Sequence, residues 1–315
     1  MTNAFPGIQG RPLAFGWIIK ANFYFLMGGA MATTTKMRFE LVKGWGKLPK
    51  SVTLGQVPHM AVDKQDRVYI LNRGTPPILV FERDGKFITG LGEGILQDPH
   101  GVRIADDGAI WVADRDAHCI VKLSPEGKLL LTIGTRGKHG SIEEGRPFNR
   151  PTGVAFASAG SLYISDGYGN ARVHHYTSDG AYEYSWGSKG DSPSRFRLPH
   201  GIFVDNQDRV YVADRENNRI QCFDDHGTYV KEWGNLHRPT DVVVDTGGNL
   251  YVPDLGDFVT VLTWNGDVLA KWGGEKSQEP GKFIAPHGIA LDSKGDIYVG
   301  EVNKGARYQK FARKA

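Results

Sequence analysis

The sequence predicts an all-β fold, a β-propeller of six blades. A Pro-x-x unit with an apolar strand, a polar turn and a second strand occurs six times, at intervals of 40 to 52 residues. In the first five repeats, a third strand and a fourth strand ending in "LG", "IG" or "WG" follow. Four short strands in a repeat of this length are typical of a propeller blade. The units begin at Pro58, Pro99, Pro151, Pro199, Pro239 and Pro286.

The predicted strands are near-continuous runs of β-branched and aromatic residues, such as "RVYVAD" at 209–214. Such runs indicate sheets that are covered on both faces, here by neighbouring blades. The sixth repeat lacks a fourth strand. We expect "FELVKGWG" at 39–46 to supply it, because that pairing closes the ring and removes the exposed sheet edges. The repeats resemble those of the NHL family, and the predicted propeller spans residues 38–315.

Residues 1–37 are expected to form a disordered or signal-like N-terminal extension. Its apolar stretch, "LAFGWIIKANFYFLM" at 13–27, is interrupted by Lys20 and is too short for a transmembrane helix. We therefore expect no stable membrane insertion and a cytoplasmic protein. The alternative is a secreted or periplasmic protein whose signal peptide is this segment.

Charge and composition narrow the class of partner. The formal net charge is +3 over 315 residues, and Lys and Arg form no long run. This pattern disfavours a nucleic-acid partner. We expect a monomer that acts on a small molecule or a peptide C-terminus. The two cysteines, Cys119 and Cys222, do not suggest a disulfide framework.

Histidine recurs in one tripeptide, Pro-His-Gly, in blades two, four and six. These residues, His100, His200 and His287, lie in alternate blades, about 120° apart around the ring axis if the ring is closed. Three imidazoles with open positions between them match a catalytic zinc site, and the ligand set also suits Fe, Co, Ni or Cu. The alternative is that Pro-His-Gly is only a repeat consensus. Threonine at this position in blades three and five argues against that.

Blade one carries His59 in its own Pro-His pair, which weakens the three-fold pattern. We interpret His59 as a fourth imidazole at the rim or as a stacking residue, and we assign it to substrate binding.

The loops that follow the second strands are expected to lie on the same face as the histidines. They carry Arg73, Arg115, Tyr168, Arg215 and Asn303. Guanidinium groups bind carboxylates well, and cations beside a phenol stabilise its phenolate, so Tyr168 is the candidate base. The alternative for each arginine is a solvated charge or a salt bridge between blades.

Acidic residues end five of the six second strands. We interpret them as structural caps of loop amides rather than as catalytic groups. They are Asp114, Asp166, Asp214, Asp254 and Glu301.

Several motifs together resemble the peptidyl-α-hydroxyglycine α-amidating lyase family. They are "LNRG", "DPHGV", "SDGYGNARV", "LPHGI", "VADRENNRIQCF" and "APHGIA", and the resemblance spans about residues 50–312. It implies a six-bladed propeller that cleaves R-CO-NH-CH(OH)-COO⁻ to an amide and glyoxylate. It also implies zinc on the three histidines, Tyr168 as the catalytic base, and Arg73 and Arg215 as catalytic groups that bind the substrate carboxylate.

The chain departs from this family at three positions. Gly169 stands where the family has a disulfide cysteine, a change that suits an intracellular enzyme better than a secreted one. Ala285 replaces a methionine that precedes the third histidine. Gly288 replaces an acidic residue that helps bind calcium, so the resemblance implies zinc here and gives no support for calcium.

Three hypotheses of function follow from the sequence. The first is a zinc-dependent lyase acting on an N-acyl-α-hydroxyglycine or a similar carbinolamide. The second is a metal-dependent hydrolase or lactonase on the same scaffold, since a metal-bound hydroxide hydrolyses esters and amides. The third is a non-enzymatic NHL interaction module, which requires a broad basic or apolar face.

Overall fold

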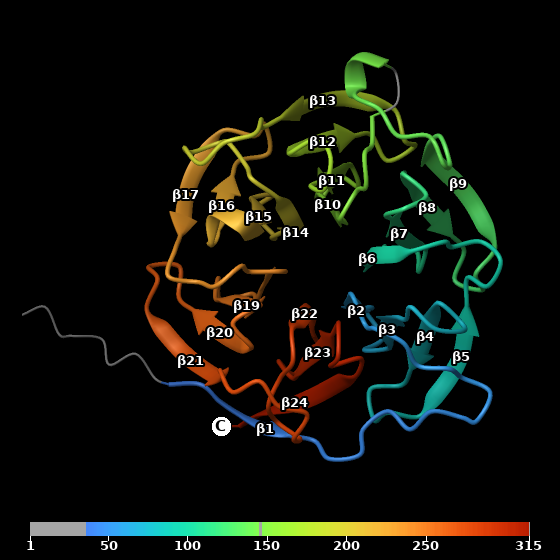
Figure 1. Ribbon diagram of the computed structural model, residues 1–315, viewed down its shortest axis with the longest axis vertical. Coiled ribbons are helices and arrows are strands. Elements are labelled where there is room, and N and C mark those ends of the chain that lie inside the picture. Colours follow the sequence, from blue (N-terminus) through green and yellow to red (C-terminus); the bar gives the residue numbers. More distant parts are fainter. Residues whose placement is uncertain (1–35, 145–146, 315) are drawn as a thin grey trace, which may run out of the picture. The chain divides into compact units, whose positions relative to one another are not determined.

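Six antiparallel sheets of four strands each form the ring that the repeats predict. The computed structural model describes residues 36–144 and 147–314, and its sheets surround a common centre (Figure 1). In every blade the first strand of the repeat is innermost and the chain runs outward. The all-β, six-bladed prediction is confirmed.

The strands are short, and in the first five blades their order in the chain is their order from the centre outward. Blade one is β2 (Met60–Val62), β3 (Val68–Leu71), β4 (Ile78–Phe81) and β5 (Phe87–Leu91). Blade two is β6 (Pro99–Ile104), β7 (Ile110–Asp114), β8 (Cys119–Leu123) and β9 (Leu129–Gly134). Blade three is β10 (Gly153–Phe156), β11 (Leu162–Asp166), β12 (Arg172–Tyr176) and β13 (Tyr182–Trp186).

Blade four is β14 (Pro199–Val204), β15 (Val210–Asp214), β16 (Arg219–Phe223) and β17 (Tyr229–Trp233). Blade five is β18 (Val243–Val244), β19 (Leu250–Asp254), β20 (Phe258–Leu262) and β21 (Val268–Gly273). Blade six is β22 (Pro286–Leu291), β23 (Ile297–Glu301), β24 (Tyr308–Lys314) and β1 (Arg38–Leu41). The short 3-10 helices η1 (Ile142–Glu144) and η2 (Arg215–Asn217) lie in loops of blades three and four.

An aspartate organises the turn between the first and second strands in four blades. In blade one, Asp63 Oδ1 accepts hydrogen bonds from the backbone N–H groups of Gln65 and Arg67, both at 2.9 Å. The hydroxyl of Tyr69, in the second strand, donates to Oδ2 of the same aspartate at 3.3 Å. Equivalent Asp–Tyr pairs, at 2.9 Å, are Asp205–Tyr211, Asp245–Tyr251 and Asp292–Tyr298. These bonds set the register of the inner hairpin that carries the site.

The hydrophobic core is divided into six clusters, one at each interface between neighbouring blades. One cluster joins Leu71 and Ile78 of blade one to Val112 and Val121 of blade two. The other five join the remaining pairs in the same way. Because both faces of every sheet are covered, strands such as β15 are buried along their whole length, as the apolar runs predict.

The first strand of the described chain lies beside the last. β1 pairs antiparallel with β24, with Arg38 opposite Lys314 and Leu41 opposite Phe311. Phe39 stacks on Trp272 of blade five, with ring centroids 5.2 Å apart.

Residues 1–35, most of the expected N-terminal extension, lie outside the described residues. Among the described residues, no helix has the length and apolarity needed to cross a membrane.

We expect Phe39→Ala to lower the free energy of unfolding by about 2 kcal/mol. A fully buried phenylalanine costs about 3–5 kcal/mol when truncated, and Phe39 is only partly buried. Urea denaturation measures the change. The neighbouring variant Glu40→Ala removes only an exposed pair with Lys314 and should leave the free energy of unfolding nearly unchanged. Equal effects of the two substitutions would contradict a structural role for β1.

Candidate metal centre

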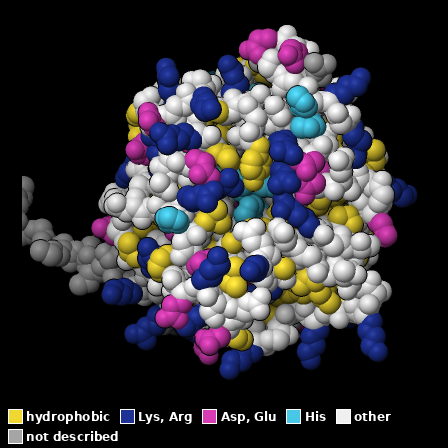
Figure 2. Space-filling model, in the orientation of Figure 1, with side chains coloured by type: hydrophobic (Ala, Val, Ile, Leu, Met, Phe, Trp, Pro, Cys, Tyr) yellow, Lys and Arg dark blue, Asp and Glu magenta, His cyan; other side chains and the backbone are white. Residues whose placement is uncertain are grey.

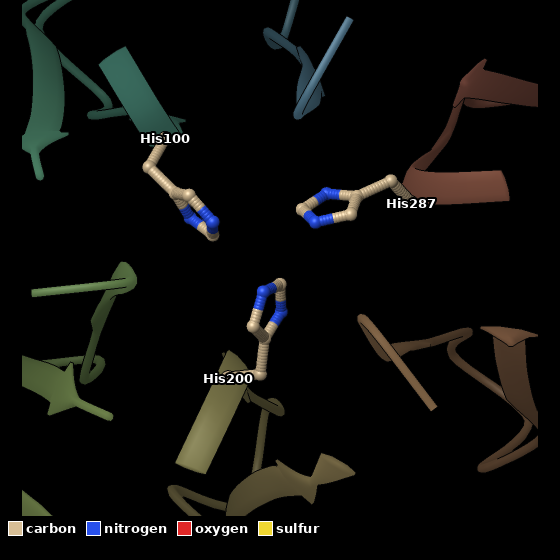
Figure 3. A group of neighbouring side chains, drawn as sticks. All are labelled: His100, His200 and His287. Atoms are coloured by element: carbon tan, nitrogen blue, oxygen red, sulfur yellow. The ribbon is translucent and has the colours of Figure 1, made fainter. Parts of the chain in front are cut away.

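Three histidines converge on the centre of the ring. His100, His200 and His287 are the second residues of β6, β14 and β22, and their rings point toward one another (Figure 3). One ring nitrogen of each lies within 4.8 Å of those of the other two. All three side chains are buried. Hence the structure brings together the set that the alternate-blade pattern predicts.

Each histidine donates a hydrogen bond from one ring nitrogen to a backbone carbonyl of the next blade. The Nδ1 atoms of His100 and His200 lie 2.8 and 2.5 Å from the carbonyl oxygens of Thr152 and Thr240. Nδ1 of His287 lies 2.6 Å from the carbonyl oxygen of Pro58. A carbonyl only accepts hydrogen bonds, so Nδ1 carries the proton and Nε2 keeps its lone pair for a ligand.

The strand register corrects the place given to His59. Val62, Val204 and Leu291 each pair with the first residue of their second strand. His200 and His287 lie four residues before Val204 and Leu291. The residue four positions before Val62 is Pro58, so Pro58 occupies the position of the central histidines in blade one. His59 falls on the position of the following glycine. The three-fold alternation is therefore complete, because blades one, three and five all lack histidine at this position.

The threonines of blades three and five link successive histidines. Besides accepting from His100, Thr152 donates its hydroxyl to the carbonyl of Pro199, at 3.0 Å. Thr240 makes the same bond to the carbonyl of Pro286, at 3.1 Å. Each hydroxyl thus fixes the peptide just before the next histidine. The glycine after each histidine permits this close approach, since a Cβ on Gly101 would lie 2.6 Å from the carbonyl oxygen of Thr152.

The acidic residues that end the second strands hold the loops leading into the histidines. Asp114 accepts from the backbone N–H of Asp98 at 2.7 Å, two residues before His100. Asp214 and Glu301 accept from the loops before the other two histidines. Their interpretation as caps of loop amides is confirmed.

The histidines are held in their neutral form. Burial lowers the pKa of His100 and of His200 well below the ordinary histidine value, and it lowers the pKa of His287 to about 3. The positive charges of Arg73 and Arg215 act on His287 in the same direction. Neutral imidazole is the form that binds a metal. Three buried, neutral Nε2 donors fit a divalent transition metal such as zinc.

Tyr168 lies directly beside this centre. Its hydroxyl oxygen is 3.3 Å from Nε2 of His100 and 3.3 Å from Nε2 of His200. Arg215 donates from Nη1 to the same oxygen at 3.3 Å, and its guanidinium carbon lies 5.5 Å from the ring centroid. One phenol thus meets two histidines and a cation.

Arg73 and Arg115 share one carboxylate. Arg73 Nε lies 2.9 Å from one oxygen of Asp98, and Arg115 Nη2 lies 2.5 Å from the other. Arg115 also packs over Tyr168, with 5.4 Å between its guanidinium carbon and the ring centroid. A polar cavity of about 530 Å³ opens beside this group, between blades one and two. Figure 2 shows Lys and Arg side chains gathered around histidine at the centre of this face.

The two other predicted substrate-binding residues have different surroundings. Asn303 is exposed in the turn after β23, and His59 pairs with Asp241, at 3.0 Å between Nε2 and Oδ2. Sequence reasoning did not select Asp98, Asp241 or Arg103. Asp241, which precedes β18, and Arg103, which lies in β6, do leave a signal, because most other blades have glycine and apolar residues at these positions.

Comparison with known proteins assigns the repeat. NHL repeats match residues 96–123, 148–176 and 196–223. The human protein named NHL repeat-containing protein 3 is 35% identical over 297 residues, which is 85% of this chain and 83% of that protein. The chain belongs to the NHL repeat proteins.

Among its NHL relatives is a protein named for the predicted reaction. Peptidyl-alpha-hydroxyglycine alpha-amidating lyase 1 of Drosophila melanogaster is 28% identical over 73% of this chain, which spans 47% of that protein. The resemblance read from the motifs is thereby confirmed. A solved structure of a streptogramin B lyase has the same fold, with a TM-score of 0.60. The match covers 88% of this chain and 97% of that chain, at 14% sequence identity.

We expect the purified protein to bind about one equivalent of zinc or cobalt, and His200→Ala to lose this binding. Removing one of three ligands leaves two, too few for a stable site. Metal analysis after dialysis measures the stoichiometry. His226→Ala is the matched control, because that histidine is exposed and belongs to the same blade. Full retention of metal by His200→Ala would contradict the site.

The neutral histidines also predict how metal-free stability depends on pH. A histidine with a folded-state pKa below its unfolded value of about 6.5 binds more protons when unfolded, so stability falls as pH drops below about 6.5. For His287, whose pKa in the fold is about 3, the loss between about pH 7 and pH 5 is about 2 kcal/mol.

We expect this loss to be absent in His287→Gln, which cannot take up the proton. The gap in unfolding free energy between the two proteins should therefore shrink by about 2 kcal/mol over that interval. Urea denaturation with a chelator present measures it. Parallel pH profiles for the two proteins would show that His287 titrates alike in the folded and unfolded chains.

Proposed function

We propose that this NHL protein is a zinc-dependent lyase that cleaves the C–N bond of an N-acyl-α-hydroxyglycine. The observation that carries the proposal is Tyr168, whose hydroxyl meets two of the three central histidines and Arg215, at 3.3 Å from each. A potential base, a metal site and a carboxylate-binding group thus share one point. The relative named as an amidating lyase supports the same reaction.

The substrate carries a carboxylate and a hydroxyl on one carbon. Arg215 and Arg73 bind the carboxylate, since guanidinium groups pair with it in two-pronged fashion. A divalent metal on the histidines, when bound, supplies a positive charge that favours the deprotonated hydroxyl. These contacts orient the carbon that bears the hydroxyl toward Tyr168.

Tyr168 performs the proton transfers. Its phenolate takes the hydroxyl proton, the electrons of that O–H bond form the carbonyl of glyoxylate, and the C–N bond breaks. The departing amide nitrogen takes up a proton, which balances the one lost from the hydroxyl. Arg215 binds the substrate carboxylate and also holds the hydroxyl of Tyr168 in place through its hydrogen bond of 3.3 Å.

Asp98 makes two of the three arginines less available to a substrate carboxylate. It neutralises part of the charge on Arg73 and Arg115, whereas Arg215 pairs with the more exposed Glu216, at 2.9 Å. Arg215 is therefore the most available carboxylate partner. The cavity of about 530 Å³ beside Arg115 receives the acyl arm, either of a small amide or of a peptide C-terminus.

We expect the wild-type protein, loaded with zinc, to convert α-hydroxyhippurate to benzamide and glyoxylate. Tyr168→Phe should bind metal normally and lose activity by about 10²–10⁴-fold, the usual contribution of a positioned base. Chromatography of both products measures the reaction. Tyr182→Phe, an exposed tyrosine of the same blade, is the matched control and should retain full activity.

The second product separates the proposed lyase from the hydrolase alternative. Amide hydrolysis of this substrate also yields glyoxylate, through collapse of the released amino hydroxy acid, but its other product is benzoate. Benzoate in place of benzamide would support the hydrolase. No turnover by the metal-loaded protein would refute the lyase proposal for this substrate class.

A further inference from the structure

A buried polar cluster lies in the central channel, farther along the inner strands than the histidines. We call it the channel plug, and it consists of His59, Arg103 and Asp241. Their side chains are 8%, 13% and 0% exposed. Arg103 also lines a small cavity of about 210 Å³ formed by the later residues of the inner strands. The plug therefore lies between that cavity and the metal centre.

The three side chains meet at one ring nitrogen, Nε2 of His59, which donates to Asp241 or accepts from Arg103 according to the tautomer. Asp241 Oδ2 lies 3.0 Å from Nε2 of His59, and Nη1 of Arg103 lies 3.1 Å from the same nitrogen. The nearest approach of Arg103 to Asp241 is 4.0 Å. Burying a charge is costly unless a partner compensates for it, so guanidinium and carboxylate depend on each other here.

The plug also bonds to the backbone of all three histidine strands. Arg103 donates from Nη1 to the carbonyl of Val102 at 3.2 Å and from Nη2 to the carbonyl of Ile202 at 3.0 Å. Asp241 Oδ2 accepts from the N–H of Ile289 at 3.1 Å. Each contacted residue follows one of the central histidines by two positions. No other polar group among the described side chains makes bonds to these three strands together.

We propose that Arg103, Asp241 and His59 are positioning residues of the metal centre. The other polar bonds between blades join neighbouring blades in pairs, and the apolar clusters between blades fix distance less sharply than directional hydrogen bonds do. The plug ties β6, β14 and β22 together one step beyond the histidines, and so it fixes how closely the three Nε2 atoms approach. The proposal rests on the metal centre of the proposed function and is independent of the reaction catalysed there.

A buried ion pair adds little net stability and often gives geometric specificity instead. The plug therefore affects metal binding more than folding. The double variant Arg103→Met/Asp241→Asn removes both charges and keeps the side-chain volumes, so no unpaired charge remains buried. The single variant Asp241→Asn, nearly isosteric, provides a second test if the double variant folds poorly.

The experiment measures zinc affinity by competition with a chromogenic chelator and the visible absorption of the cobalt-loaded protein. We expect both plug variants to bind zinc about tenfold or more weakly and to show an altered cobalt spectrum, as happens when residues that support metal ligands are lost. Thermal unfolding of the metal-free proteins is measured in parallel. It should change less in the double variant than in the control below, whereas Asp241→Asn, which leaves the charge of Arg103 unpaired, should be less stable than the double variant.

Arg83→Met is the matched control. This arginine pairs with Asp292 and Asp296, at 2.7 and 2.6 Å, where blades one and six meet. Its loss should lower stability and leave zinc affinity and the cobalt spectrum unchanged. Wild-type affinity and spectrum in the plug variants would overturn the proposal, as would an equal loss of affinity in Arg83→Met. A wild-type protein that binds no cobalt would instead refute the metal centre itself.

Discussion

The candidate site depends on one repeated interaction, the hydrogen bond from a histidine Nδ1 to a backbone carbonyl of the next blade. It occurs three times, to Thr152, Thr240 and Pro58, and each time it turns Nε2 toward the axis. Because this hydrogen bond joins one blade to the next, it forms at all three histidines only if the ring is closed and the inner strands of neighbouring blades keep a fixed register. The Asp–Tyr turns, the strand caps and the pairing of β1 with β24 together provide that register.

Electrostatics around the centre favour binding a cation and an anion together. Arg73 and Arg215 lie close enough to lower the pKa of His287, and the same charges oppose a bound metal ion. Asp98 offsets part of that charge, and in the proposed function a substrate carboxylate offsets more. Each anion that enters therefore strengthens the attraction for the metal, by the same linkage through which the metal strengthens the attraction for the anion.

Much of this arrangement could be predicted from the sequence. Six spaced Pro-x-x units predict the blade count, and the alternation of His100, His200 and His287 with threonine indicates a shared site, because a closed ring places alternate blades symmetrically. The position of His59 could not be read from the tripeptide, since one missing residue in the first strand of blade one shifts it toward Asp241. Register is set by strand pairing, which the spacing of prolines does not determine.

Side-chain partners were the least predictable part. The sequence correctly placed three arginines, Arg73, Arg115 and Arg215, in the loops after the second strands. It did not indicate that Asp98 pairs with Arg73 and Arg115. Asp98 is separated from Arg73 by a whole outer strand pair and meets it only because neighbouring blades pack together. The charges of Arg103 and Asp241 in apolar strands were a readable signal, because an unpaired charge there would be costly.

The three-fold symmetry of the histidines is not shared by their surroundings, and this difference gives the site a direction. Pairing of Pro199 with Asp214, and of Pro99 with Asp114, places Arg215 and Arg115 opposite the residues two positions before their histidines. In blade six the same pairing places Val302 opposite Ala285, two positions before His287, and Val302 is buried and apolar. In the proposed function, an anionic group is therefore attracted by the arginines of blades one, two and four, whereas Val302 offers it no charge at blade six. This asymmetric ring of charge around a symmetric metal site then orients a small hydroxy acid in one way, as cleavage of a single bond requires.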